Sequence, residues 1–124
     1  MSEVIVTARL TPQGLQETAY QASSLHDAAQ HEPDGVYTVT RTFERDKALY
    51  LDAHLDRLED SAQQEHIALT LDRGALRAAL RALIDCAGYP EARFRITVPR
   101  QDPATLYLAL EPLPGLPPNA KTEG

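Results

Sequence analysis

Hydrophobic and polar residues recur along the chain with two different periods, and these periods predict its elements. Three segments alternate at every second residue, as a strand does when one of its faces is buried. Two others repeat hydrophobic residues at intervals of three and four, the period of an amphipathic helix. A further strand is expected near the start, where β-branched residues are frequent. The predicted strands are Val4–Leu10, Val36–Phe43, Ala92–Val98 and Thr105–Glu111.

Each predicted helix begins at an aspartate, whose carboxylate can accept the free N–H groups of a first helical turn. Asp52 precedes the first helix and Asp72 the second. Gly88 and Pro90 end the second helix, because glycine accepts a positive φ and proline cannot continue a helix. The hydrophobic stripes consist of Leu51, Leu55, Leu58 and Ala62 in the first helix and Leu76, Leu80, Leu83, Ile84 and Ala87 in the second.

Turn and cap residues predict two shorter features. The polar tetrapeptide Glu44–Lys47 lets the preceding strand reverse into Ala48–Leu51, which predicts a hairpin. Ser23–Ala29 can form one helical turn with a serine cap, and Glu32–Gly35 then breaks it. The residues between the first strand and this turn give no clear pattern.

Together these elements predict an α+β fold, in which a mostly antiparallel sheet of four or five strands carries two main helices packed on one face. A chain of 124 residues suits one domain that can bury a core. Residues 1–111 are expected to form this domain. Residues 112–124 are rich in proline and are predicted to be a linker or tail.

Composition narrows the possible partners. The net charge of −6 argues against nucleic acid and against an anionic membrane surface. No hydrophobic run approaches the ~20 residues of a membrane span, and no signal peptide is visible, so a cytoplasmic protein is expected. The lone Cys86 is expected to be a buried thiol. The four histidines lack the spacing of zinc ligands, so no metal site is predicted.

One stretch resembles a known family. Gly35-Val36-Tyr37 opens a strand, and His54-Leu55-x-Arg57-Leu58-x-x-Ser61-Ala62 follows on a helix. This pattern is similar to that of the class IV aminotransferases, the fold-type-IV enzymes that use pyridoxal phosphate. The resemblance covers the front part of such enzymes and implies that this chain is their small N-terminal domain. It also implies that Arg57 binds the phosphate of the cofactor.

The chemistry of that family needs a lysine amine, and the two lysines here are poorly placed for it. Lys47 lies in the charged turn and Lys121 in the proline-rich tail. The resemblance implies that the catalytic lysine belongs to a larger C-terminal domain, which follows a linker similar to Leu113–Pro118. We therefore expect no catalytic residue in this chain and no transamination by it alone. Pyridoxal 5′-phosphate would bind only with a C-terminal catalytic domain or second subunit, in an expected homodimer.

Four residues are candidates for the site. Arg57 could instead be a surface arginine that pairs with Glu59, Asp60 or Ser61. Tyr37 stands where the family has an aromatic residue beside the substrate. Arg41 and Arg95 could each bind the carboxylate of a small amino or keto acid, or simply be solvated strand residues.

The identity and the hand of the substrate, and the choice between transaminase and lyase, stay open at this stage. The alternative to an enzyme domain is a non-catalytic α+β module for interaction or dimerisation, which would expose a hydrophobic patch. A free-standing binder of small ligands is a third possibility, with Arg57 and Tyr37 as its supporting residues.

Overall fold

The computed structural model describes residues 5–43, 47–48, 51–89 and 91–112. Within these ranges the chain forms an α+β fold, as the sequence predicts. Two of its strands, β2 and β4, are short and lie at the two edges of the sheet. The elements in chain order are β1 (Val6–Thr11), β2 (Gly14–Glu17), α1 (Leu25–His31), β3 (Gly35–Phe43), β4 (Lys47–Ala48), α2 (Leu51–Gln64), α3 (Arg73–Ala87), β5 (Ala92–Pro99) and β6 (Leu106–Pro112).

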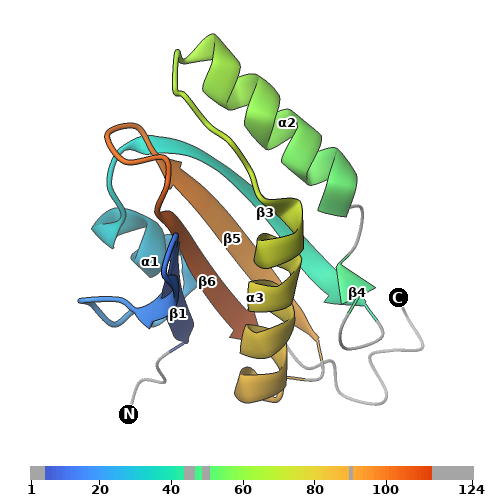
Figure 1. Ribbon diagram of the computed structural model, residues 1–124. Helices are drawn as coiled ribbons and strands as arrows, with labels where there is room; N and C mark the ends of the chain where they lie inside the picture. The colour runs from blue at the N-terminus through green and yellow to red at the C-terminus, as the bar shows by residue number, and fades with distance from the viewer. Residues whose placement is uncertain (1–4, 44–46, 49–50, 90, 113–124) are drawn as a thin grey trace, which may run out of the picture.

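The described strands form a single sheet with the order β2-β1-β6-β5-β3-β4 (Figure 1). Every neighbouring pair is antiparallel. The longest pairing joins β3 to β5, from Gly35 opposite Pro99 to Arg41 opposite Arg93. The two predicted central strands, β5 and β6, lie side by side and place Phe94 opposite Leu110.

Helices cover both faces of this sheet. The stripes of α2 and α3 pack against the hydrophobic side chains of β5 and β6, and Leu55, Leu76 and Phe94 are fully buried in that core. The shorter α1 packs on the opposite face, where Leu25 and Ala28 meet the small side chain of Ala109. Figure 1 shows α3 across the front of the sheet and α2 along β3. The prediction of two main helices on one face is confirmed.

Local capping follows the sequence. The side chain of Ser24 accepts a hydrogen bond from the backbone N–H of Asp27 at the start of α1. The side chain of Asp72 does the same for Ala75 at the start of α3, and Gly88 ends that helix with a φ of 69°. These contacts satisfy backbone groups that a helix end leaves without an intrahelical partner.

Four local expectations are wrong. Helix α2 begins at Leu51, so Asp52 lies inside its first turn and is not the residue that caps it. Leu51 is therefore helical, and the return strand of the hairpin is β4, which covers residues 47–48. The strand β2 was not predicted, because its four residues carry one large hydrophobic side chain. Cys86 is exposed, since it lies on the side of α3 that faces away from the sheet.

The proposed boundary between domain and tail falls at the end of β6, whose last residue is Pro112. The predicted linker, residues 113–118, and Lys121 lie outside the described residues, as does the turn 44–46. None of the described helices is long and apolar enough to cross a membrane.

Candidate functional site

The open face of the sheet carries three of the four predicted site residues. Tyr37 and Arg41 alternate with buried threonines on β3 and are both exposed. Arg95 on β5 lies opposite Val39 in the register, so it belongs to the same face. This is the face that α1 covers only beside β6. The ends of β3 and β5 beside α1 therefore leave part of the sheet uncovered.

Tyr37 and Arg95 are in contact. The guanidinium carbon of Arg95 lies 3.9 Å from the centroid of the Tyr37 ring, which is the geometry of a cation–π interaction. The Nε of Arg95 also donates to the carboxylate of Glu32, at 2.9 Å. Tyr37 is 57% exposed, so this contact holds an aromatic ring in place on an open surface.

Arg41 has a different environment. It lies directly opposite Arg93 across the β3–β5 pairing, and both side chains are exposed. Like charges in directly opposed strand positions repel each other. The two guanidinium groups therefore give this end of the open face a positive charge that suits a carboxylate.

Arg57 comes from the other layer of the molecule. It lies on α2 and is exposed. Because α2 begins at Leu51, Arg57 is its seventh residue, and the expectation that it lies at the N-terminus of the helix is wrong. The attraction of a helix terminus for an anion fades within the first turn, so the guanidinium alone must supply the binding energy.

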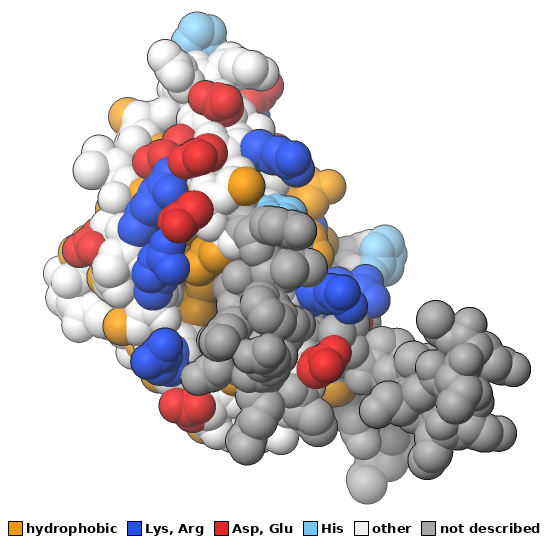
Figure 2. Space-filling model, turned by 90° about the vertical axis from the view of Figure 1, so that its right-hand side faces the viewer, with side chains coloured by type: hydrophobic (Ala, Val, Ile, Leu, Met, Phe, Trp, Pro, Cys, Tyr) orange, Lys and Arg blue, Asp and Glu red, His pale blue; other side chains and the backbone are white. Residues whose placement is uncertain are grey.

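The acidic residues around Arg57 on α2 are already paired with α3. Arg73 donates to Asp56 at 2.7 Å and to Glu59 at 2.5 Å, and Arg77 pairs with Asp52. Figure 2 shows these acidic and basic side chains interleaved on the face formed by the two helices. Glu59 was one of the residues expected to pair with Arg57 if Arg57 had only a surface role. Among the described residues, no hydrogen bond or ion pair holds Arg57.

His54 links the helix that carries Arg57 to the sheet. Its Nδ1 lies 2.9 Å from the Oγ1 of Thr38, a buried residue of β3. Partial burial, and then the positive charge of Arg57, lower the pKa of His54 below its usual value of 6.5. The imidazole is therefore neutral at physiological pH and is available for this hydrogen bond.

This shift predicts a pH dependence of stability. Between pH 6.5 and the lower folded pKa, the unfolded chain binds more protons at His54 than the folded chain does, so stability falls as the pH falls through this window. We expect His54→Gln to lose less stability than the wild type between pH 7.5 and pH 5.5, as measured by urea unfolding. The exposed His66→Gln is the control. Equal losses for His54→Gln and the wild type would contradict the prediction.

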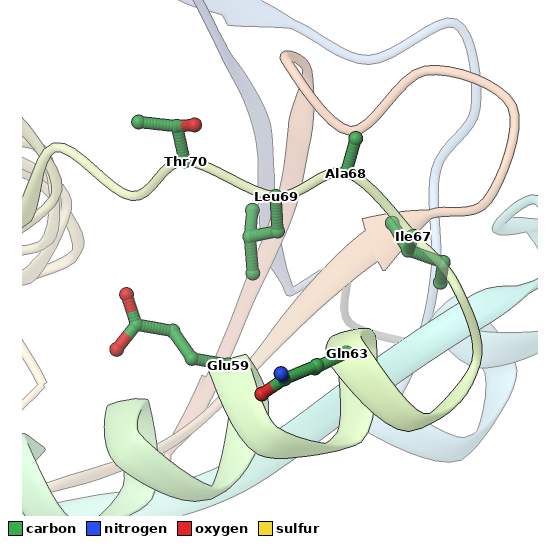
Figure 3. A pocket seen from close by; sticks show the side chains of 6 residues that line it. All are labelled: Glu59, Gln63, Ile67, Ala68, Leu69 and Thr70. Carbon is green, nitrogen blue, oxygen red and sulfur yellow. The ribbon is translucent and has the colours of Figure 1, made fainter.

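An open hollow of about 360 Å³ lies between α2 and the segment that leads to α3. Figure 3 shows Glu59 and Gln63 on the helix facing Ile67–Thr70 across it. Glu59, the charged residue of this lining, is held by Arg73. The hollow contains none of the predicted site residues. No three metal-binding side chains come together among the described residues.

The fold thus brings Tyr37, Arg41 and Arg95 to one face and leaves Arg57 on the helical layer. Sequence reasoning missed Glu32 and Arg93 as members of the open face. Alternation on β5 already placed Arg93 beside Arg95, and the register with β3 then sets it opposite Arg41. Nothing in the local sequence marks Glu32, because its partner Arg95 lies 63 residues away.

Comparison with solved structures finds the same fold in larger enzymes. A proposed branched-chain amino acid aminotransferase from Thermotoga maritima matches with a TM-score of 0.63 and 19% identity, over 90% of this chain and 39% of its own. A hypothetical aminotransferase from Mycobacterium tuberculosis in its apo form gives 0.59 and 21%, over 89% and 41%. The T.th. branched-chain amino acid aminotransferase with pyridoxamine 5′-phosphate gives 0.62 and 15%, over 94% and 42%.

This chain therefore spans about two fifths of the length of these structures. No curated protein sequence matches it. The family model of the class IV aminotransferases matches residues 35–122, a range that begins at Gly35 and includes Tyr37, Arg57 and Arg95. The match covers more than half of the chain, so the chain belongs to the class IV aminotransferase family.

Proposed function

We propose that this chain is the small N-terminal domain of a class IV aminotransferase, or of a related lyase, that depends on pyridoxal phosphate. Arg57 binds the phosphate of the cofactor, and Tyr37, Arg41 and Arg95 form one wall of the pocket for a small amino or keto acid. A larger domain or second subunit, in a homodimer, supplies the catalytic lysine. The partial coverage of the similar structures supports such a partner.

The observation that carries the proposal is the free guanidinium of Arg57. Its acidic neighbours Asp56 and Glu59 are neutralised by Arg73, which leaves the charge of Arg57 without a described partner. A guanidinium can donate two parallel hydrogen bonds to a phosphate, a geometry that an ammonium group lacks. The side chains present therefore fit the phosphate of this cofactor.

When bound, the cofactor supplies the electron sink for amino-group transfer. The residues of this chain hold and orient. Arg57 fixes the phosphate end, the Tyr37 ring presents an aromatic surface, and Arg41 offers a positive charge to a carboxylate. Neither lysine of the chain supports a catalytic role, because Lys47 lies in the edge strand β4 and Lys121 is in the proline-rich segment.

An interaction module is less well supported. The large hydrophobic side chains exposed in the described part of the chain are Leu15 and Tyr37. Leu15 lies on the edge strand β2 and Tyr37 on β3, with three strands between them. Two separated side chains do not make the broad hydrophobic patch that a protein interface usually shows.

The phosphate role can be tested with two ligands that differ only in that group. We expect the chain to bind pyridoxamine 5′-phosphate about 10-fold more tightly than pyridoxamine, a difference of ~1.4 kcal/mol that one arginine–phosphate contact can supply. Arg57→Ala should abolish this preference, and Arg57→Lys should restore part of it. Titrations followed by NMR chemical shifts give both dissociation constants.

Arg81→Ala is the matched control, because Arg81 is an exposed arginine on α3. It should leave the preference for the phosphorylated ligand unchanged. A wild-type chain that binds both ligands equally, or an Arg57→Ala variant that keeps the full preference, would show that Arg57 does not bind the phosphate.

A further inference from the structure

A buried carboxylate lies beside the open face of the sheet. Glu32 follows α1, and its side chain is 1% exposed. Its Oε1 accepts hydrogen bonds from the Nε of Arg95 at 2.9 Å and from the Oγ1 of Thr97 at 2.5 Å. Its Oε2 is buried and has no hydrogen-bond partner among the described residues. An isolated buried charge is costly, so the carboxylate depends on the positive charge of Arg95.

Arg95 is held on two sides. Glu32 and Thr97 lie at its Nε, and the Tyr37 ring covers one face of its guanidinium. Its side chain is 15% exposed, whereas Tyr37 is 57% exposed. The surface that meets solvent here is therefore mainly the aromatic ring, with a neutral ion pair beneath it.

We propose that Glu32 is a specificity-determining residue of the substrate pocket. Its carboxylate cancels the charge of Arg95, so the wall beside Tyr37 accepts a neutral substrate side chain and gives no advantage to one that ends in a second carboxylate. This inference rests on the proposed function, because it assumes that the open face lines the pocket.

The charges on the two halves of the face support this division. The Arg95–Glu32 pair has no net charge, and the aromatic ring above it offers area for a hydrophobic group. Further along the same strands, Arg41 and Arg93 carry two positive charges. Glu111 lies on the other side of Arg93, and its carboxylate accepts the first backbone N–H of α1. One end of the face thus suits the carboxylate that every amino or keto acid has, and the other end suits a neutral side chain.

The test compares two keto acids of the same length. 2-Oxoglutarate ends in a second carboxylate, and 2-oxopentanoate ends in a methyl group. NMR titration should give the wild-type chain no preference for 2-oxoglutarate. Glu32→Gln keeps an acceptor for Arg95 and Thr97 but removes the negative charge, so the preference for 2-oxoglutarate should rise about fivefold. In the Glu32→Gln/Arg95→Gln double variant this gain should vanish.

Thr97→Val is the matched control, since it removes a hydrogen bond of Glu32 without changing any charge. It should leave the preference unchanged, which a purely structural role of the cluster would not predict. A folded Glu32→Gln variant with the wild-type preference, or one that binds neither acid, would overturn the proposal.

A measurement on the wild type avoids any folding defect of the variants. The Nε–H of Arg95 should exchange slowly, and its NMR signal should not move when 2-oxoglutarate is added. A shift of that signal by 2-oxoglutarate would overturn the proposal. The pyridoxamine 5′-phosphate titration separates the two ideas, because a failure there removes the phosphate role of Arg57 and leaves the charge effect of Glu32 to be judged on its own result.

Discussion

Replacing Gly35 with alanine is expected to destabilise the fold by about 3 kcal/mol or more, the upper range for forcing extra atoms into a packed site. A Cβ at Gly35 would lie 1.9 Å from the carbonyl oxygen of Val98 and 2.9 Å from the Cα of Pro99. Both are backbone atoms, so no side-chain rotation can relieve the overlap. The strands β3 and β5 would have to separate at the end where Tyr37 contacts Arg95. Urea unfolding followed by circular dichroism gives the free energy of unfolding.

Gly74 provides the control for this substitution. A Cβ there would have one neighbour, a carboxylate oxygen of Asp72 at 3.5 Å, which is an ordinary contact distance. Gly74 also lies in the first turn of α3, where alanine favours helix. Gly74→Ala should leave stability unchanged or raise it by up to about 1 kcal/mol. If Gly35→Ala were as stable as the wild type, the close approach of β3 and β5 at Gly35 would be wrong.

Replacing Leu55 with alanine is the second large effect, with an expected loss of about 2–5 kcal/mol. Leu55 is fully buried, and it lies in the stripe that attaches α2 to the sheet. The same helix carries His54 and Arg57 on either side of this stripe. Loosening α2 should therefore weaken the hydrogen bond between His54 and Thr38 and also the binding of pyridoxamine 5′-phosphate.

Leu15→Ala is the same chemical change at an exposed position, since Leu15 is 39% exposed on the edge strand β2. Its effect on the free energy of unfolding should stay within about 0.5 kcal/mol. Both variants can be compared in one urea series. Equal, small losses at the two positions would mean that α2 does not depend on this stripe for its attachment.

These substitutions connect the fold to the proposed site. The backbone contact at Gly35 fixes the ring of Tyr37 over Arg95, and the α2 stripe fixes the guanidinium of Arg57 beside the sheet. One group of site residues therefore depends on strand pairing and the other on helix packing. Damage to either should appear first in stability and then in ligand binding.

The sequence by itself determined the elements whose pattern is local. Alternation on β5 and β6, and the stripe and caps of α3, were all predicted from neighbouring residues. The motif around Arg57 likewise indicated the family, and the family model confirms it. Such features are visible in sequence because each records which side of one element is buried.

The tertiary structure alone decided how the charges are distributed. Arg57 is left free because Arg73 and Arg77, on another helix, take the acidic residues of α2. Arg95 is neutralised by Glu32, which arrives from the end of α1. Both outcomes depend on side chains that are distant in sequence and meet only after the elements pack. Periodicity describes each element separately, so it contains no information about which charges of two elements will meet.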